Sequence, residues 1–373
     1  MDKATSGFRL EGIEALRAFA ALSIVIVHII VLGNISLPKE LSFIPSYFGL
    51  GVMLFFVVSG FGLTYGYIGR IKNSNDLSEY YIRRFARIAP LFYFMIALYV
   101  VLAYNGIGHK ISPSDFLLNA LFLFNLVPSK AEGIVSASWT IGVEMLVYLV
   151  FPLLINLCKS LKTSIVALIA SIALGYQFSN YILGEMPSQS GYAGSNVITN
   201  LPFFIFGICG YHIYSTLREA KFISGQKTLS YAIWALIFLA SFGVVNGWFG
   251  SYSRIPARYQ WGAIFSAICV AASLHPTWLI SNATTKYIGK ISFSLYLLHP
   301  IFLYWMGVFG VYKYTYSIFD SVMLGFITSV AVSVVVIVAA SALTFNFIEK
   351  PGMILGRKIG KSVYNKRERR ETA

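Results

Sequence analysis

The sequence has 373 residues, of which 57% are hydrophobic and only 12% are charged. Soluble domains carry roughly 25% charged residues, so this composition excludes a chain built of soluble domains and indicates a polytopic membrane protein. The net charge of +14 is typical of nucleic-acid-binding proteins, but in a membrane protein the positive residues belong in cytoplasmic loops. We therefore expect membrane lipids, and no nucleic acid, as partners. The three cysteines lie in apolar stretches without a pairing pattern, so neither a disulfide framework nor a metal site is predicted.

Stretches of about 20 apolar residues are typical of transmembrane helices. We predict an all-α integral membrane protein with about ten such helices. It would form one membrane domain over residues 1–351, followed by a basic cytoplasmic tail over 352–373. The predicted spans are 13–33, 47–68, 88–105, 139–157, 163–183, 197–215, 229–248, 259–280, 291–312 and 321–346.

A shorter apolar stretch, 115–127, decides the orientation of every span after it. If it does not cross the membrane and the N-terminus is cytoplasmic, 22 Lys and Arg residues lie on the cytoplasmic side and 6 on the outer side, with Arg17 inside the first span. If it crosses, the division becomes 11 against 17. Because positive residues concentrate in cytoplasmic loops, we expect 115–127 to be a re-entrant or interfacial helix and both termini to be cytoplasmic.

The first span contains Arg17 and His28, which are costly to bury in a membrane. Their spacing of eleven residues places them on one face of a helix, roughly 16 Å apart along its axis. Arg17 falls near the inner end of the span, and His28 lies five residues from the outer end. A purely structural interpretation is an arginine that reaches the inner headgroups and a histidine bonded to a backbone carbonyl.

The second and third spans add small residues and arginines. Ser59 and Gly60 lie in the second span, where small residues permit close helix packing, although Ser59 could also donate to a substrate carbonyl. Arg83, Arg84 and Arg87 lie just inside the membrane, before the third span. The planar guanidinium group binds phosphate oxygens two at a time, which favours a phosphorylated ligand. These arginines could instead contact anionic lipids.

The fourth span begins at Trp139 and contains Glu144 five residues later, at the depth predicted for His28. A carboxylate and an imidazole at one depth can form an acid–base pair if their helices are neighbours. Glu144 could instead form a structural hydrogen bond between helices. In the ninth span, Tyr296 and His299 share one helix face. Pro300 has no N–H group, so it frees a backbone carbonyl one turn earlier, near Tyr296.

In this order the motifs resemble the acyltransferase 3 family of integral-membrane O-acyltransferases, whose O-acetyltransferases modify polysaccharides, lipopolysaccharide O-antigens and other glycans. One departure is Val147-Tyr148, where the family often has two aromatic residues. The resemblance covers most of the chain and is carried by Arg17 and His28; Gly51-Val52 to Phe55-Phe56 with Ser59-Gly60-Phe61; Arg83-Arg84 and Arg87 before Pro90; Trp139 to Glu144 with Tyr148 and Pro152; Ser292 to Tyr296 with His299; and Ile348-Glu349-Lys350-Pro351.

The resemblance implies an enzyme of the bacterial inner membrane that moves an acyl group, expected to be acetyl, from cytoplasmic acyl-CoA to a hydroxyl of a glycan on the outer side. It implies acetyl-CoA as the donor and no metal. His28 would be the general base, or a nucleophile that carries the acyl group, with Glu144 and Arg17 as the other catalytic residues. The implied acyl-CoA-binding residues are Arg83, Arg84, Arg87, Ser59 and Gly60, and the implied channel residues are Trp139, Tyr296 and His299. We expect no soluble domain after the tail, so that the spans and outer loops would form the acceptor site.

Three further functions are compatible with buried ionisable residues. A transporter or flippase with a histidine–carboxylate relay would contain them too. It predicts repeats and broken helices in both halves, and the sequence has no such symmetry. A different multispan O-acyltransferase family is the second possibility, and a non-catalytic scaffold for glycan assembly is the third. Transfer of label from acetyl-CoA to a glycan separates these possibilities.

Overall fold

The structure of the protein is a computed structural model that describes residues 10–108, 110–220, 225–249 and 254–371, with side chains at all of these except 254–256 and 364–371. Every regular element in these ranges is a helix. The ten helices that fall on the predicted spans are α1 (Glu11–Gly33), α3 (Gly51–Tyr67), α4 (Ser74–Tyr104), α6 (Trp139–Leu157), α7 (Leu161–Glu185), α9 (Val197–Glu219), α10 (Gln226–Val245), α11 (Arg254–Leu274), α13 (Ser292–Val308) and α15 (Val322–Thr344).

Shorter elements connect these helices. They are η1 (Lys39–Leu41), α2 (Ile44–Tyr47), η2 (Phe48–Leu50), α5 (Pro113–Ala120), η3 (Phe124–Leu126), η4 (Pro128–Lys130), η5 (Pro187–Gln189), α8 (Tyr192–Ser195), α12 (Ala283–Lys290), α14 (Val311–Ser317) and the π-helical turn η6 (Phe345–Glu349). The last helix is α16 (Lys350–Glu371).

The expected membrane architecture is confirmed in its main features. Among the described residues, eight helical segments are long and apolar enough to cross a membrane, and the pair α12 and α13, bent by 72°, would be a ninth. The remaining predicted span, 259–280, corresponds to α11, which packs against α9 and α10. Residues 115–127 form only the eight-residue α5 and the turn η3. Eight residues rise about 12 Å, far less than the ~30 Å hydrocarbon core, so this stretch does not cross, as predicted.

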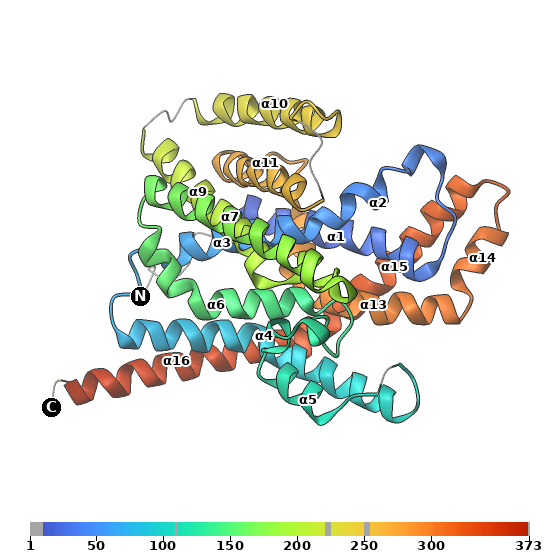
Figure 1. Ribbon diagram of the computed structural model, residues 1–373, viewed down its shortest axis with the longest axis horizontal. Coiled ribbons are helices and arrows are strands. Elements are labelled where there is room, and N and C mark those ends of the chain that lie inside the picture. The colour runs from blue at the N-terminus through green and yellow to red at the C-terminus, as the bar shows by residue number, and fades with distance from the viewer. Residues whose placement is uncertain (1–9, 109, 221–224, 250–253, 372–373) are drawn as a thin grey trace.

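The helices form a bundle in which α10 and α11 lie at one edge, α4 and α16 lie at the opposite edge, and the helices around α1 lie between them (Figure 1). The start of α1 meets the end of α11 and the end of α12, because Gly12 approaches Ala272 and Gly289 approaches the carbonyl of Glu14. The end of α1 instead lies beside α14. The start of α1 and the end of α12 therefore lie at one end of the bundle, and the end of α1 and α14 lie at the other end, as the ten-span topology requires.

The basic tail continues α15 as helix α16, which runs antiparallel to α4 (Figure 1). Three glycines four residues apart, Gly352, Gly356 and Gly360, face α4, where small residues allow two helices to approach closely. The turn η6 precedes Pro351, whose ring would clash with a regular helix, and a wider π turn accommodates it. This turn directs Glu349 into the bundle, where it is buried.

Helices α3 and α9 cross at two glycines. A Cβ atom at Gly60 would lie 2.1 Å from the carbonyl oxygen of Phe204, and one at Gly207 would lie 2.1 Å from the carbonyl oxygen of Val57. Only glycine allows backbones to approach this closely. Gly60 therefore packs against α9 and lines none of the described cavities, and its expected part in acyl-CoA binding stays a prediction.

Candidate active site

Glu144 lies in a central cavity of about 40 Å³ between α1, α3, α6 and α13. Its carboxylate accepts a hydrogen bond from the hydroxyl of Ser59 on α3, at 3.1 Å, and another from the hydroxyl of Tyr148, one turn further along α6. Ser59, predicted from the sequence to bind acyl-CoA, therefore lies beside the central cavity, but its hydroxyl donates to the Glu144 carboxylate.

Arg17 lies at the junction between the central cavity and a larger cavity at the end of the bundle where α1 begins. Its Nε atom is buried and has no hydrogen-bond partner among the residues that the structure describes. Glu144 and Glu349 lie close enough to attract its charge, and Arg87 lies close enough to repel it. Arg17 is therefore a half-buried cation with a buried, uncommitted Nε donor at the junction of two cavities.

The structure does not bring Glu144 together with His28, and no contact joins these two side chains in the described part of the chain. The pairing predicted from equal depth is wrong because α6 does not begin at the bundle surface. The segment before α6 folds into the core, where Phe124 is fully buried and Asn125 donates to the carbonyl of Trp139 at 3.4 Å. Glu144 is consequently deeper than counting from Trp139 indicates.

His28 has one ring nitrogen committed to its own helix. Its Nδ1 lies 2.8 Å from the carbonyl oxygen of Ile24. A carbonyl oxygen can only accept, so Nδ1 carries the proton and the Nε2 atom of the neutral imidazole carries a lone pair. No described residue hydrogen-bonds to that Nε2 atom. This arrangement suits a general base, because the basic nitrogen remains available to a substrate hydroxyl.

His299, on α13, lies against His28, and its Nδ1 atom is likewise bonded to a carbonyl of its own helix. The two ring centroids are 4.9 Å apart, with the ring planes inclined by 63°. Pro300 lacks the N–H that would bond to the carbonyl of Tyr296. The Nδ1 atom of His299 donates a hydrogen bond to that carbonyl instead, at 2.5 Å. The freed carbonyl predicted from Pro300 is thus confirmed. The Nε2 atom of His299 is buried and has no partner among the described residues.

The Tyr296 hydroxyl separates the central cavity from the opposite end of the bundle. It accepts a hydrogen bond from Thr140 at 2.9 Å and donates to the carbonyl of Ala137 at 3.0 Å. Ala137 has a φ of 62°, which a residue with a Cβ atom rarely adopts. Such strained positions cluster at ligand-binding and catalytic sites. Trp139 packs edge-on against Phe56 beside this wall.

The cavity at the start of α1, which we call the inner cavity, has a volume of about 390 Å³. It lies between α1, α3, α4, α12 and α16. Five of its side chains are cationic and two are carboxylates: Arg17, Arg87, Lys290, Lys350 and Arg357, with Glu14 and Glu349. Ser294 donates to the carboxylate of Glu349 at 2.8 Å. The inner cavity therefore carries a net positive charge.

The three neighbouring arginines of α4 point to different places. Arg87 lines the inner cavity. Arg84 donates to the hydroxyl of Tyr67 at 2.8 Å and lies over the rings of Tyr67 and Tyr148. Arg83 forms an ion pair with Glu79. Arg83 and Arg84 line a neighbouring cavity of about 410 Å³, which shares Gly62 with the inner cavity, so Arg84 and Arg87 line different but adjoining cavities.

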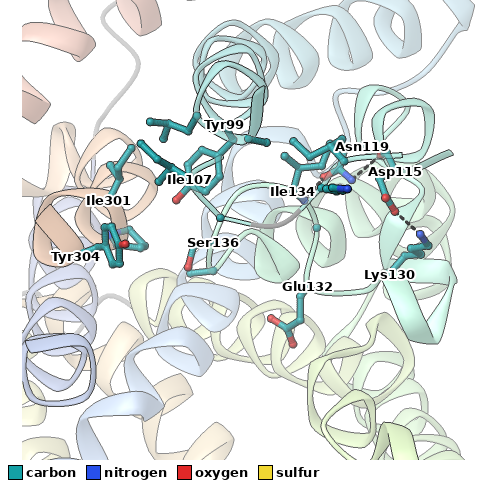
Figure 2. Close-up of a pocket in the computed structure, with 18 of the residues that line it drawn as sticks. Tyr99, Ile107, Asp115, Asn119, Lys130, Glu132, Ile134, Ser136, Ile301 and Tyr304 are labelled. Carbon is teal, nitrogen blue, oxygen red and sulfur yellow. Dashed lines mark hydrogen bonds and ion pairs between the residues drawn. The ribbon is translucent and has the colours of Figure 1, made fainter. Parts of the chain in front are cut away.

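At the opposite end of the bundle lies the largest described cavity, the outer cavity, of about 620 Å³ (Figure 2). It is bounded by α4, α5, the segment before α6 and α13. Asp115 and Lys130 form an ion pair across one wall, and hydrogen bonds from Lys130 and Ser112 hold the pKa of Asp115 at about 2. Glu132 lies apart from that pair in Figure 2, and desolvation raises the pKa of its carboxyl.

Several site residues have no strong signal in the sequence. Lys290, Lys350 and Arg357 are single charges near helix ends, and such charges usually only set topology. Glu349 belongs to a short motif at the end of a span, where a carboxylate is usually exposed, so the sequence does not indicate that it is buried. In the ranges that the structure describes, no three His, Cys, Asp or Glu residues lie together as a metal site would require.

Comparisons with known proteins identify the family of the chain. A family model of an acyltransferase domain matches residues 10–344. Peptidoglycan O-acetyltransferase OatA of Listeria monocytogenes is 25% identical, covering 77% of this chain and 48% of its own length. YrhL of Bacillus subtilis, provisionally named for the same activity, is 24% identical over 92% of this chain and 54% of its own length. The chain therefore spans about half the length of these relatives. ORF330 of Acidianus two-tailed virus, provisionally named an acetyltransferase, is 25% identical over 80% of this chain and 85% of its own length. No solved structure matches significantly.

Proposed function

This chain belongs to the acyltransferase 3 family, and from that premise we propose that it is an O-acetyltransferase of the bacterial inner membrane. It takes an acetyl group from cytoplasmic acetyl-CoA and transfers it to a hydroxyl of a cell-surface glycan, such as an exopolysaccharide or a lipopolysaccharide O-antigen. The names of the relatives support acetyl transfer to a glycan hydroxyl, since one of them is a peptidoglycan O-acetyltransferase.

The charge of the cavities is the observation that carries this proposal. The inner cavity has five cations against two carboxylates, whereas the outer cavity has Lys110 and Lys130 against Asp115 and Glu132. Coenzyme A is a polyanion with phosphate groups that guanidinium and ammonium groups bind well. Electrostatics therefore favour the donor in the inner cavity and an acceptor of low charge in the outer cavity.

Arg17 and His28 define the path that the acetyl group follows. The phosphates bind in the inner cavity, and the pantetheine arm extends past Arg17 along α1. The eleven residues from Arg17 to His28 rise about 16 Å, a suitable length for this arm. Tyr296 and His299 line the path beside the central cavity.

At its end, the Nε2 atom of His28 removes the proton of the acceptor hydroxyl while that oxygen attacks the thioester carbonyl. The carbon–sulfur bond breaks, and the leaving thiolate of coenzyme A takes the proton from the imidazolium. In a nucleophilic mechanism, the acetyl group first passes to Nε2 of His28 and then to the acceptor hydroxyl.

The donor site makes a quantitative prediction. Replacing Arg87 or Arg357 with alanine should weaken the binding of acetyl-CoA by about 1.5–3 kcal/mol each, which is the contribution of a charged hydrogen bond. Higher salt should also weaken binding, since salt screens exposed charges. Isothermal titration of the purified protein with acetyl-CoA at two ionic strengths measures both effects.

A matched control is Lys358→Ala, because Lys358 follows Arg357 on α16 but does not line the inner cavity. Its affinity for acetyl-CoA should equal that of the wild type. Unchanged affinity in folded Arg87→Ala and Arg357→Ala proteins would exclude the inner cavity as the donor site.

The proposal also fixes the orientation of the chain. The inner cavity must face the cytoplasm, where acetyl-CoA is made, so both termini are cytoplasmic and the positive residues lie inside. A reporter fused after Ala373 should read as cytoplasmic, and one inserted at Gly191, between α7 and α9, should read as external. A cytoplasmic reading at Gly191 would contradict this orientation.

A further inference from the structure

The outer cavity combines features of a saccharide-binding site. At about 620 Å³ it is within the range of roughly 300–1,000 Å³ that small-molecule sites occupy. Its lining includes three aromatic side chains, Tyr99, Tyr304 and Trp305, and Figure 2 shows Tyr99 and Tyr304 on different helices that border the cavity. Aromatic rings offer an apolar face with a polar edge, which suits sugar rings that present C–H groups on one face and hydroxyls at the rim.

The polar groups of the cavity divide into committed and available ones. Asp115 is paired with Lys130, and Asn119 is held by the backbone of Asp115 and Ile134. The carboxylate of Glu132 has no hydrogen bond or ion pair to any described residue. A carboxylate in this state is a strong acceptor for hydroxyl groups. The remaining charges balance, because the lining has two lysines and two carboxylates.

The outer cavity also adjoins the histidine pair. Leu32, one turn after His28 on α1, and Pro300, directly after His299 on α13, both line it. Ala137 also lines the outer cavity, and Tyr296 lines the central cavity. The hydroxyl of Tyr296 donates to the carbonyl of Ala137, so this contact lies between the two cavities. Both imidazoles therefore lie on helices that border the outer cavity, His28 one turn before Leu32 and His299 directly before Pro300.

We propose that the outer cavity binds an uncharged pyranose unit of the acceptor glycan, with Trp305 as the stacking ring, Tyr304 as an adjoining aromatic wall inclined to it by 76°, and Glu132 as the acceptor of its hydroxyl hydrogen bonds. This rests on the proposed function for the reaction that the sugar undergoes, but the binding site itself does not depend on catalysis. Sugars that carry carboxylates are disfavoured, because the lining has no excess of positive charge to bind them, with two lysines against two carboxylates.

The test uses the full chain in nanodiscs of zwitterionic phosphatidylcholine. The probes are chitotetraose, which is neutral, and tetragalacturonate, which is anionic. Saturation-transfer-difference NMR reports binding without any acetyl donor. Chitotetraose should bind, and Trp305→Ala and Glu132→Ala should each weaken that binding about tenfold, the effect of losing roughly 1.4 kcal/mol. Tetragalacturonate should bind at least tenfold more weakly than chitotetraose.

Trp248→Ala is the matched control, because Trp248 is an exposed tryptophan in the turn after α10 that does not line the outer cavity. It should bind chitotetraose as the wild type does. Acetyl-CoA titrations of all variants should give unchanged affinity, which shows that they are folded and that the donor site is intact.

The outcomes separate this inference from the proposed function. If the wild type binds chitotetraose in a Trp305-dependent manner but transfers no acetyl group, the binding site stands and the proposed function fails. If the wild type acetylates a glycan but Trp305→Ala and Glu132→Ala leave the acceptor KM unchanged, the binding site is wrong and the function stands. Equal or tighter binding of tetragalacturonate, or no chitotetraose binding, would also overturn the inference.

Discussion

Replacing His28 with alanine is expected to lower acetyl transfer by about 10²–10⁴-fold, which is the usual contribution of a positioned general base. The reason is geometric: Nδ1 is fixed by the carbonyl of Ile24, so Nε2 is the basic nitrogen, and it is not bonded to any described residue. Affinity for acetyl-CoA should remain, because the cations of the inner cavity lie about 16 Å away along α1. Transfer of radiolabelled acetyl to a glycan in reconstituted membranes measures the loss.

His212→Ala is the control for this experiment. The Nε2 atom of His212 lies 2.8 Å from the carbonyl oxygen of Cys158, a structural contact outside the described cavities. We expect near-normal transfer from this variant. If His28→Ala retains near-normal activity while it binds acetyl-CoA, the chemistry does not occur at His28. The buried and unpartnered Nε2 of His299 would then be the first candidate for the base.

Local chemistry along one helix could be predicted from the sequence. Pro300 removes a hydrogen bond at a known distance along α13, so the free carbonyl of Tyr296 followed directly. The charge count also predicted that residues 115–127 do not cross, because the distribution of positive residues depends on the whole chain. Both predictions use spacing within a helix or an overall count, which the sequence contains explicitly.

Contacts between helices could not be predicted in the same way. Depth from the surface placed Glu144 beside His28, but the segment before α6 is buried and moves the start of that helix inward. The partner of His28 is instead His299, 271 positions later in the chain. Likewise, Lys290 and Arg357 join Arg87 only because α12 and α16 pack around one cavity. Such neighbours depend on helix rotation and packing, which spacing along the chain does not determine.

The correction at Glu144 changes what its substitution should do. Without contact to His28, Glu144→Gln removes no charge that supports the imidazole. The pH profile of transfer should therefore keep its shape, even if the rate falls. The effect of Glu144 should instead appear together with that of Arg17, because the two side chains line the same small central cavity.

Replacing Arg17 with methionine is expected to leave the melting temperature unchanged or higher, while it weakens acetyl-CoA binding by about 1.5–3 kcal/mol. Arg17 is a half-buried cation whose buried Nε has no partner among the described residues, and holding such a charge away from water costs stability. The nearby carboxylates keep other partners, since Glu144 accepts from Ser59 and Tyr148, and Glu349 accepts from Ser294. Methionine fills similar space without that cost.

Arg258→Met is the matched control for this prediction, because Arg258 is another deeply placed arginine, and its donors are used. It donates to the carbonyl of Gly194 at 3.2 Å and reaches Asn200 at 3.5 Å. Its loss takes one of two donors from the Gly194 carbonyl, which the Asn200 amide also reaches, and leaves the Oδ1 atom of Asn200 without a donor among the described residues. This variant should therefore melt at a lower temperature and bind acetyl-CoA normally. Thermal unfolding in detergent and acetyl-CoA titration measure both properties. A large fall in the melting temperature of Arg17→Met, with normal donor affinity, would show that Arg17 is a structural residue. We expect the opposite result, an unchanged or higher melting temperature with weaker acetyl-CoA binding. It would mean that the chain retains an unfavourable charge at this position because acetyl-CoA binding requires it.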